Sequence, residues 1–125
     1  MTTAGKLGET YCFGGDAQMQ NIEIVDFGCG VGNSAPFLRK YFRTAEIYGV
    51  DVSSESIKVA NSLHNNDSIR FQKIDACLPF PNEQFDVIFS ACVFHHIPIH
   101  QRFFWLTEIY RCLKPNGILM IYEHN

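Results

Sequence analysis

Apolar residues in this chain follow two kinds of pattern along the sequence. Short segments rich in apolar residues predict strands, and the most continuous of these runs predict strands that are buried on both faces. These runs lie at about 22–27, 46–50, 69–74, 85–90 and 118–122. Segments in which apolar residues recur every three or four positions predict amphipathic helices. They are residues 34–42, a stretch that begins after Ser53 or Ser54 and ends at Asn65, and residues 99–112.

Each predicted helix has one stripe of apolar residues that we expect to face the sheet. The three stripes are Phe37, Leu38, Tyr41 and Phe42; Ile57, Ala60 and Leu63; and Phe103, Leu106, Tyr110 and Leu113. No helix is expected in the ten residues between the third and fourth strands, because Pro79 and Pro81 interrupt them. Residues 114–117, Lys-Pro-Asn-Gly, predict a turn before the last strand.

Strands that alternate with helices predict an α/β fold with a doubly wound, mostly parallel sheet and right-handed crossovers. In such sheets ligands bind at the carboxyl ends of the strands. Four polar residues lie at or near these ends, namely Asp26, Asp51, Asp75 and Ser90. Their convergence predicts a ligand site at this edge of the sheet.

The composition is that of a single globular domain. The chain has 125 residues, of which 46% are hydrophobic, which is enough for one core. The formal net charge of −3 and the scattered Lys and Arg residues argue against a nucleic-acid surface. No apolar run is long enough to span a membrane, and residues 1–7 lack a secretion signal, so we expect a cytoplasmic protein. Five cysteines without a C-x-x-C pair argue against a disulfide framework or a metal site.

Residues 1–20 are polar and glycine-rich, and they predict a flexible N-terminal arm. Residues 21–125 predict the folded domain.

The most informative stretch begins as a buried strand and ends in glycines at alternate positions. Its pattern is D-x-G-x-G-x-G, formed by Asp26, Gly28, Gly30 and Gly32. Such glycines let the backbone turn sharply and let a ligand approach it closely. A buried carboxylate is costly unless it is paired, so we expect Asp26 to face a ligand. The dinucleotide pattern G-x-G-x-x-G would need a glycine in place of Asn33, which disfavours a nicotinamide-binding dehydrogenase domain.

With these motifs, the chain from about Asn21 onward resembles the class I S-adenosylmethionine-dependent methyltransferases, whose first motif has the same D-x-G-x-G-x-G form. The segment Phe94-His95-His96-Ile97 resembles the corresponding segment of small-molecule enzymes related to the ubiquinone and menaquinone C-methyltransferases. The resemblance implies S-adenosyl-L-methionine as the cofactor and a small-molecule acceptor. It also implies a Rossmann-like sheet of strand order 3-2-1-4-5.

The resemblance assigns roles to individual residues. Asp51 would accept hydrogen bonds from the ribose diol, although a carboxylate there also suits the start of a helix. Asp75 would accept from the adenine amine, or else close a turn. Asp26 would face the methionine amino group, or else bind backbone amides. Val52 and Cys77 would contact the adenine ring. The other residues expected around the cofactor, besides the three glycines, are Cys29, Ala76, Ser90 and Ala91.

Two histidines are candidates for a catalytic role. Methyl transfer is a displacement that depends on alignment and the exclusion of water, and a general base is needed only for some acceptors. His95 and His96 follow the fourth strand, where the methyl group would lie, and we favour His96. In the family that the chain resembles, such histidines are often structural.

Members of this family continue beyond the fifth parallel strand with a helix and an antiparallel strand pair. This chain stops at Asn125, so we expect either a missing C-terminal segment, a partner subunit, or a homodimer formed through the exposed edge of residues 118–122. Two functions stay open: a methyltransferase acting on a small molecule, and a cofactor-binding module without turnover of its own.

Overall fold

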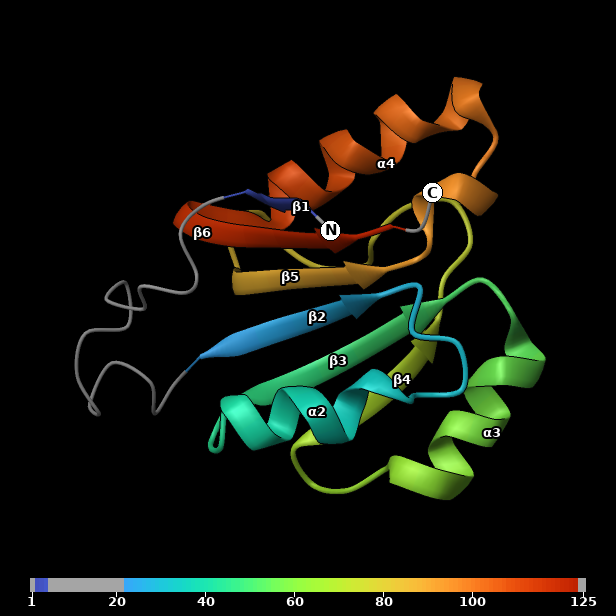
Figure 1. Cartoon of the computed structure of the whole chain (residues 1–125), viewed down its shortest axis with the longest axis vertical. Helices are drawn as coiled ribbons and strands as arrows, with labels where there is room; N and C mark the ends of the chain where they lie inside the picture. The colour runs from blue at the N-terminus through green and yellow to red at the C-terminus, as the bar shows by residue number, and fades with distance from the viewer. Residues whose placement is uncertain (1, 5–21, 124–125) are drawn as a thin grey trace.

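The computed structural model describes residues 2–4 and 22–123. Figure 1 shows its elements. In chain order they are β1 (Thr2–Ala4), β2 (Glu23–Phe27), α2 (Ser34–Tyr41), β3 (Glu46–Asp51), α3 (Ser54–His64), β4 (Ile69–Lys73), β5 (Phe85–Ala91), the short 3₁₀ helix η3 (Phe94–His96), α4 (Ile99–Cys112) and β6 (Leu113–Tyr122). The helices and the first four buried strands match the predicted ranges within one or two residues.

The sheet has six strands in the order β1-β6-β5-β2-β3-β4. Strands β2 to β6 are parallel, and their order β4-β3-β2-β5-β6 is the expected 3-2-1-4-5. The outer edge of β6 is not open as predicted, because β1 pairs with residues 119–121 in antiparallel register. Of the predicted arm, residues 5–20 lie outside the described residues, and residues 2–4 form this strand.

The predicted turn at 114–117 is a bulge inside β6. Leu113 pairs with Phe85 and Ile118 pairs with Val87, so four residues of β6 face the single residue Asp86. Asn116 has a φ of 72°, the left-handed conformation that asparagine tolerates in turns. The strand therefore begins five residues earlier than the apolar run that predicted it.

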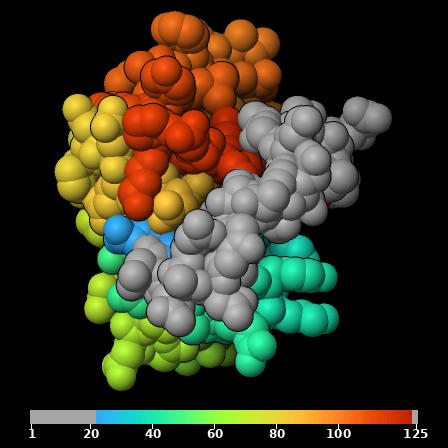
Figure 2. Space-filling view, turned by 90° about the vertical axis from the view of Figure 1, so that its left-hand side faces the viewer, coloured from blue at the N-terminus to red at the C-terminus, as the bar shows by residue number. Residues whose placement is uncertain are grey.

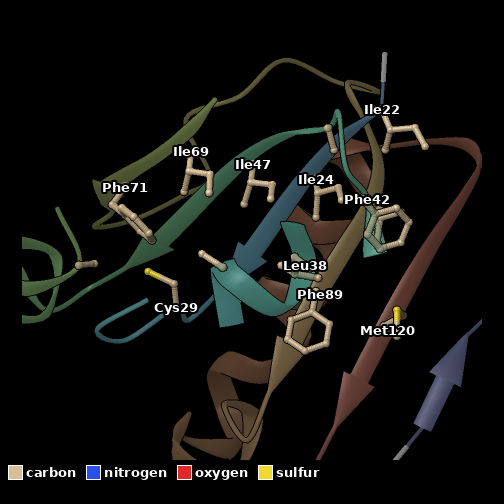
Figure 3. Close-up of a cluster of buried hydrophobic side chains, with 14 of the residues drawn as sticks. Ile22, Ile24, Cys29, Leu38, Phe42, Ile47, Ile69, Phe71, Phe89 and Met120 are labelled. Atoms are coloured by element: carbon tan, nitrogen blue, oxygen red, sulfur yellow. The ribbon is translucent and has the colours of Figure 1, made fainter. Parts of the chain in front are cut away.

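Apolar side chains fill both faces of the sheet. One core lies under α2 and α3, and the other lies under α4 (Figure 1). In the first core Ile24, Ile47 and Ile69 form a row across β2, β3 and β4, with Leu38 of α2 above them (Figure 3). In the space-filling view α4 (orange, top) and α2 (teal) lie on opposite sides of the molecule (Figure 2). A sheet covered on both faces explains the nearly continuous apolar runs.

The buried face predicted for α4 is wrong. Phe103 and Tyr110 are 80% and 81% exposed, and the helix instead buries Trp105, Ile109 and Cys112. Both stripes are apolar and have helical spacing, so periodicity alone cannot choose between them. The Trp105 ring packs against Phe27 of β2, with 5.6 Å between ring centroids, and this large aromatic surface decides the orientation.

The stripes predicted for α2 and α3 are only partly buried. In α2, Leu38 faces the core, whereas Phe37 and Tyr41 are exposed and pack on each other. In α3, Ile57 and Ala60 are buried and Leu63 is exposed.

The loop between β4 and β5 contains no helix, as predicted, and α4 holds it in place. Arg111 donates hydrogen bonds to the carbonyls of Leu78 and Phe80, at 2.9 and 2.7 Å, and to the side chain of Asn82. Glu108 pairs with Arg111 and accepts from the Leu78 amide. The hydrogen bond from Arg111 lowers the pKa of Glu108, so this carboxylate stays charged.

Candidate cofactor site

The glycine turn after β2 is fastened to the end of β3. The amides of Gly28 and Cys29 both donate to the Val50 carbonyl, at 2.8 and 2.9 Å. The amide of Gly30 donates to Oδ2 of Asp51 at 2.8 Å. Gly28 and Gly30 have φ values of 71° and 54°, which lie in the left-handed region that favours glycine. Three consecutive amides thus bind one short segment of the neighbouring strand.

Asp51 connects this turn to the start of α3. Its Oδ1 accepts from the Ser53 amide at 2.9 Å. The cap of the helix is Ser53, whose side chain accepts from the Ser56 amide. The two Asp51 oxygens carry more lone pairs than these bonds use, so the carboxylate can still accept from a ligand.

The three glycines of the turn have different surroundings. A Cβ on Gly28 would lie 2.5 Å from a methyl carbon of Val93, and a Cβ on Gly32 would lie 2.8 Å from the His64 ring. A Cβ on Gly30 would meet no atom within 4 Å. The turn is therefore packed at both ends and open in its middle, as a cradle for a ligand requires.

Asp26 lies inside β2 and is only 2% exposed. Among the described residues its Oδ2 has no hydrogen-bond partner. Burial, and secondly the negative charge of Asp51, raise the pKa of Asp26 to about 7. A buried acceptor without a partner beside a glycine turn fits a ligand that brings a donor or a positive charge.

Cys29 is buried in the same turn, where its side chain lies beside Phe71 (Figure 3). Burial and the nearby carboxylates raise the pKa of the Cys29 thiol, which stays protonated. Its side chain acts as a small apolar group here.

A cleft of about 320 Å³ opens beside the turn, at the carboxyl ends of the strands. Of the residues predicted for the site, the cleft is lined by Gly28, Asp51, Val52, Ala91 and His96. The sequence analysis missed Phe27, Ile74, Cys92, Val93, Ile97 and Trp105. Ile97 and Val93 belong to the apolar segment after β5, and the apolar character of that segment could have predicted that it lines a ligand site. Trp105 was missed because the wrong stripe of α4 was chosen.

The other residues predicted for the cofactor are not part of the cleft lining; they are Asp26, Cys29, Gly30, Gly32, Asp75, Ala76, Cys77 and Ser90. Asp75, Ala76 and Cys77 are exposed, and Asp75 pairs with Lys73. Ser90 is fully buried, and its hydroxyl has no partner among the described residues. Their roles at the cofactor stay predictions.

The two histidines after β5 have different environments. His95 Nδ1 lies 2.9 Å from Oε1 of Glu123, the residue that follows β6. His96 lines the cleft. Of the two, only His96 is among the residues that line the cleft, and the centroids of the two rings are 4.0 Å apart.

A larger hollow of about 730 Å³ lies at the opposite end of the sheet, between the end of α4 and the bulge of β6. Its lining includes Leu106, Tyr110 and Lys114. The smaller cleft is lined by Gly28, the first glycine of the turn, and by the strand-end carboxylate of Asp51, so we place the site there.

This sheet, with a D-x-G-x-G-x-G turn after its first parallel strand and an aspartate at the end of its second, defines a class I S-adenosylmethionine-dependent methyltransferase domain. Residues 25–121 match the family model described as a methyltransferase domain, and the chain belongs to that family. This result confirms the resemblance seen in the sequence, and S-adenosyl-L-methionine is the cofactor of the family.

Individual relatives agree with this assignment. The chain is 33% identical over 105 residues to the fatty-acid O-methyltransferase of Mycolicibacterium smegmatis, a match that covers 83% of this chain and 38% of that protein. Phosphoethanolamine N-methyltransferase 2 of Haemonchus contortus, in complex with S-adenosyl-L-methionine, is similar in structure with a TM-score of 0.70 and 28% identity, covering 92% of this chain and 26% of the other. A Haloferax volcanii methyltransferase, solved with the Trm112 activator, has a TM-score of 0.68 and 30% identity, covering 78% and 43%.

We predict that alanine substitutions at Gly28 and Gly30 act differently. Gly28→Ala should lower the free energy of unfolding by about 2 kcal/mol or more, because the methyl group is strained and meets Val93. Gly30→Ala should cost only about 1 kcal/mol but weaken S-adenosylmethionine binding, because its methyl group enters the open cradle. Denaturant unfolding and calorimetric titration check both. Unchanged affinity in Gly30→Ala would show that the cofactor does not approach this glycine.

We predict that Asp26 makes the ligand-free domain less stable as the pH rises. Since its pKa is raised from 3.8 to about 7, the folded state holds this proton more tightly than the unfolded state. The stabilising contribution is complete below pH 4 and is lost as the pH rises through 7. Relative to Asp26→Asn, the natural domain should lose about 2–3 kcal/mol between pH 5 and pH 8. Denaturant unfolding at both pH values checks this, and an equal difference at both would contradict it.

Proposed function

We propose that this domain binds S-adenosylmethionine in the cleft and transfers its methyl group to a small-molecule acceptor. The observation that carries the proposal is the glycine turn, which is open at Gly30, tied to Asp51 and placed beside the unpaired carboxylate oxygen of Asp26. The chain spans 38% of the length of the fatty-acid enzyme that it resembles, so the activity of the whole protein is part of the proposal.

Each carboxylate near the cleft has a proposed partner on the cofactor. Asp51 would accept from the ribose hydroxyls with its remaining lone pairs. Asp26 would accept from the methionine amino group, whose positive charge would offset the cost of burying the carboxylate. Asp75 would accept from the adenine amine after leaving Lys73, and Val52 would cover the ring. When bound, the cofactor supplies a methyl group on a positively charged sulfur.

The residues of the cleft would promote transfer by alignment and by excluding water. Trp105, Ile97 and Val93 form an apolar wall there. His96 lies on the same lining and would accept a proton from an acceptor with a hydroxyl group, whereas a fatty-acid carboxylate is already ionised and needs no base. His95 is the weaker candidate, because Glu123 already holds its ring.

The acceptor that we propose has an apolar body. This choice is supported by the apolar wall of the cleft, and by the similarity to an enzyme named for fatty acids. An acceptor oxygen would lie near His96, and the apolar body would lie against the wall.

A cofactor-binding module without turnover of its own is the second candidate, because the chain spans only 38% of its relative. In that case a partner subunit would complete the site, as a solved relative in complex with an activator protein illustrates. We favour such a partner over a homodimer through the edge of β6, since β1 occupies part of that edge.

In the described part of the chain, no helix has both the length and the apolar character needed to cross a membrane. We retain a cytoplasmic location as part of the proposal.

We predict that Asp51→Asn weakens S-adenosylmethionine binding by about ten- to a hundredfold, because loss of a charged acceptor costs about 1.5–3 kcal/mol. The matched control is Glu46→Gln at the opposite end of β3. Calorimetry should show no measurable binding of NAD to the natural chain. Unchanged affinity in Asp51→Asn would remove the support for the ribose role.

We expect the chain to transfer radiolabelled methyl groups from S-adenosylmethionine to a long-chain fatty acid in preference to phosphoethanolamine. Thin-layer chromatography of the labelled products measures transfer to both acceptors, because methylated phosphoethanolamine would stay in the aqueous phase on extraction, and a reaction without acceptor is the blank. Binding without transfer to either acceptor would favour the module without turnover.

A further inference from the structure

The carboxylate of Glu123 accepts hydrogen bonds from three consecutive backbone amides in the cleft wall, those of residues 93–95. Its Oε2 accepts from the amides of Val93 and Phe94, both at 3.1 Å. Its Oε1 accepts from the His95 amide at 3.1 Å and contacts the His95 ring at 2.9 Å. Four donors therefore converge on one side chain from a different strand.

Strand pairing brings this carboxylate to the turn. Ala91 at the end of β5 pairs with Tyr122 at the end of β6. Cys92 then reverses the chain with a φ of 58°, which turns the following amides toward the residue after β6. Residue 123 is thus the first position beyond the sheet from which a side chain can reach them.

The bonding keeps Glu123 charged. Its side chain is 29% exposed. Burial raises the pKa of Glu123, but the hydrogen bonds from the His95 ring and the three amides outweigh this effect and lower it. A charged acceptor gives stronger hydrogen bonds than a neutral one.

The turn that Glu123 holds contacts both parts of the site. The methyl groups of Val93 lie where a Cβ on Gly28 would be, so the turn packs directly on the glycine turn. The Phe94 ring stacks on Phe27 with 5.7 Å between centroids. His96 and Val93 both line the cleft. A shift of this turn would therefore move Val93, which packs against the glycine turn, and change the direction of the His96 ring at the same time.

We propose that Glu123 is a positioning residue: it binds the amides of residues 93–95 and thereby holds Val93 against Gly28 and His96 toward the acceptor. The part concerning His96 rests on the proposed function. Glu123 itself touches neither cofactor nor acceptor in this role, and its ion pair with His95 is secondary to the amide bonds.

The test compares Glu123→Ala, Glu123→Gln and His95→Ala with Glu46→Gln as the matched acidic control. The first measurement is amide hydrogen exchange at residues 93–95, which needs neither cofactor nor turnover. We expect exchange to accelerate about tenfold or more in Glu123→Ala, less in Glu123→Gln, which keeps one acceptor oxygen, and little in His95→Ala. The protection of β2 and β3 amides from hydrogen exchange should be unchanged, and this result would separate local positioning from a general loss of stability.

The second measurement is calorimetric binding of S-adenosylmethionine, with kcat as a further readout where transfer occurs. Affinity should fall about three- to tenfold in Glu123→Ala and less in Glu123→Gln, with kcat reduced more than affinity. Unchanged exchange at residues 93–95 in Glu123→Ala would overturn the proposal, as would equal losses in His95→Ala and Glu123→Ala. If the natural chain does not bind the cofactor, the proposed function fails, whereas the exchange measurement still decides the role of Glu123.

Discussion

The site depends on one constraint, the attachment of three consecutive amides of the glycine turn to the last two residues of β3. Successive amides of an ordinary strand point in opposite directions, so they cannot all reach the same neighbour. Left-handed φ values at Gly28 and Gly30 redirect them. A side chain at either glycine would strain this backbone. The cradle at Gly30 is therefore shaped by hydrogen bonds within the chain itself.

The same attachment creates an electrostatic cost. It brings the carboxylate of Asp51 near that of Asp26, and the Asp51 charge adds to the effect of burial in raising the pKa of Asp26. Asp51 is stabilised by two amides, whereas one oxygen of Asp26 has no partner among the described residues. Part of the folding free energy is thus lost to a buried group that a ligand with a donor or a positive charge would satisfy, as is common at functional sites.

The features that the sequence predicted are those encoded locally. The apolar runs located the buried strands, and the glycine spacing located the turn. Features that depend on tertiary packing were missed. Trp105 and Phe103 lie on equally regular stripes of α4, and tertiary packing in the core that contains Phe27 selects Trp105. Nothing near Glu123 in sequence indicates a contact, because its partners lie about 30 residues earlier and meet it through the pairing of β5 with β6.

Two walls of the cleft are thus turns that a carboxylate at or just beyond the end of a neighbouring strand helps to hold. Asp51 at the end of β3 accepts a hydrogen bond from the Gly30 amide of the glycine turn. Glu123, which follows β6, accepts hydrogen bonds from the amides of residues 93–95. The two turns meet where the Val93 methyl groups occupy the space that a side chain at Gly28 would fill. Because valine has few allowed χ1 rotamers, a shift of one turn is passed directly to the other through this contact. In the proposed complex, the distance between a cofactor at the glycine turn and an acceptor near His96 would therefore depend on Gly28 and Val93, which carry no chemistry themselves.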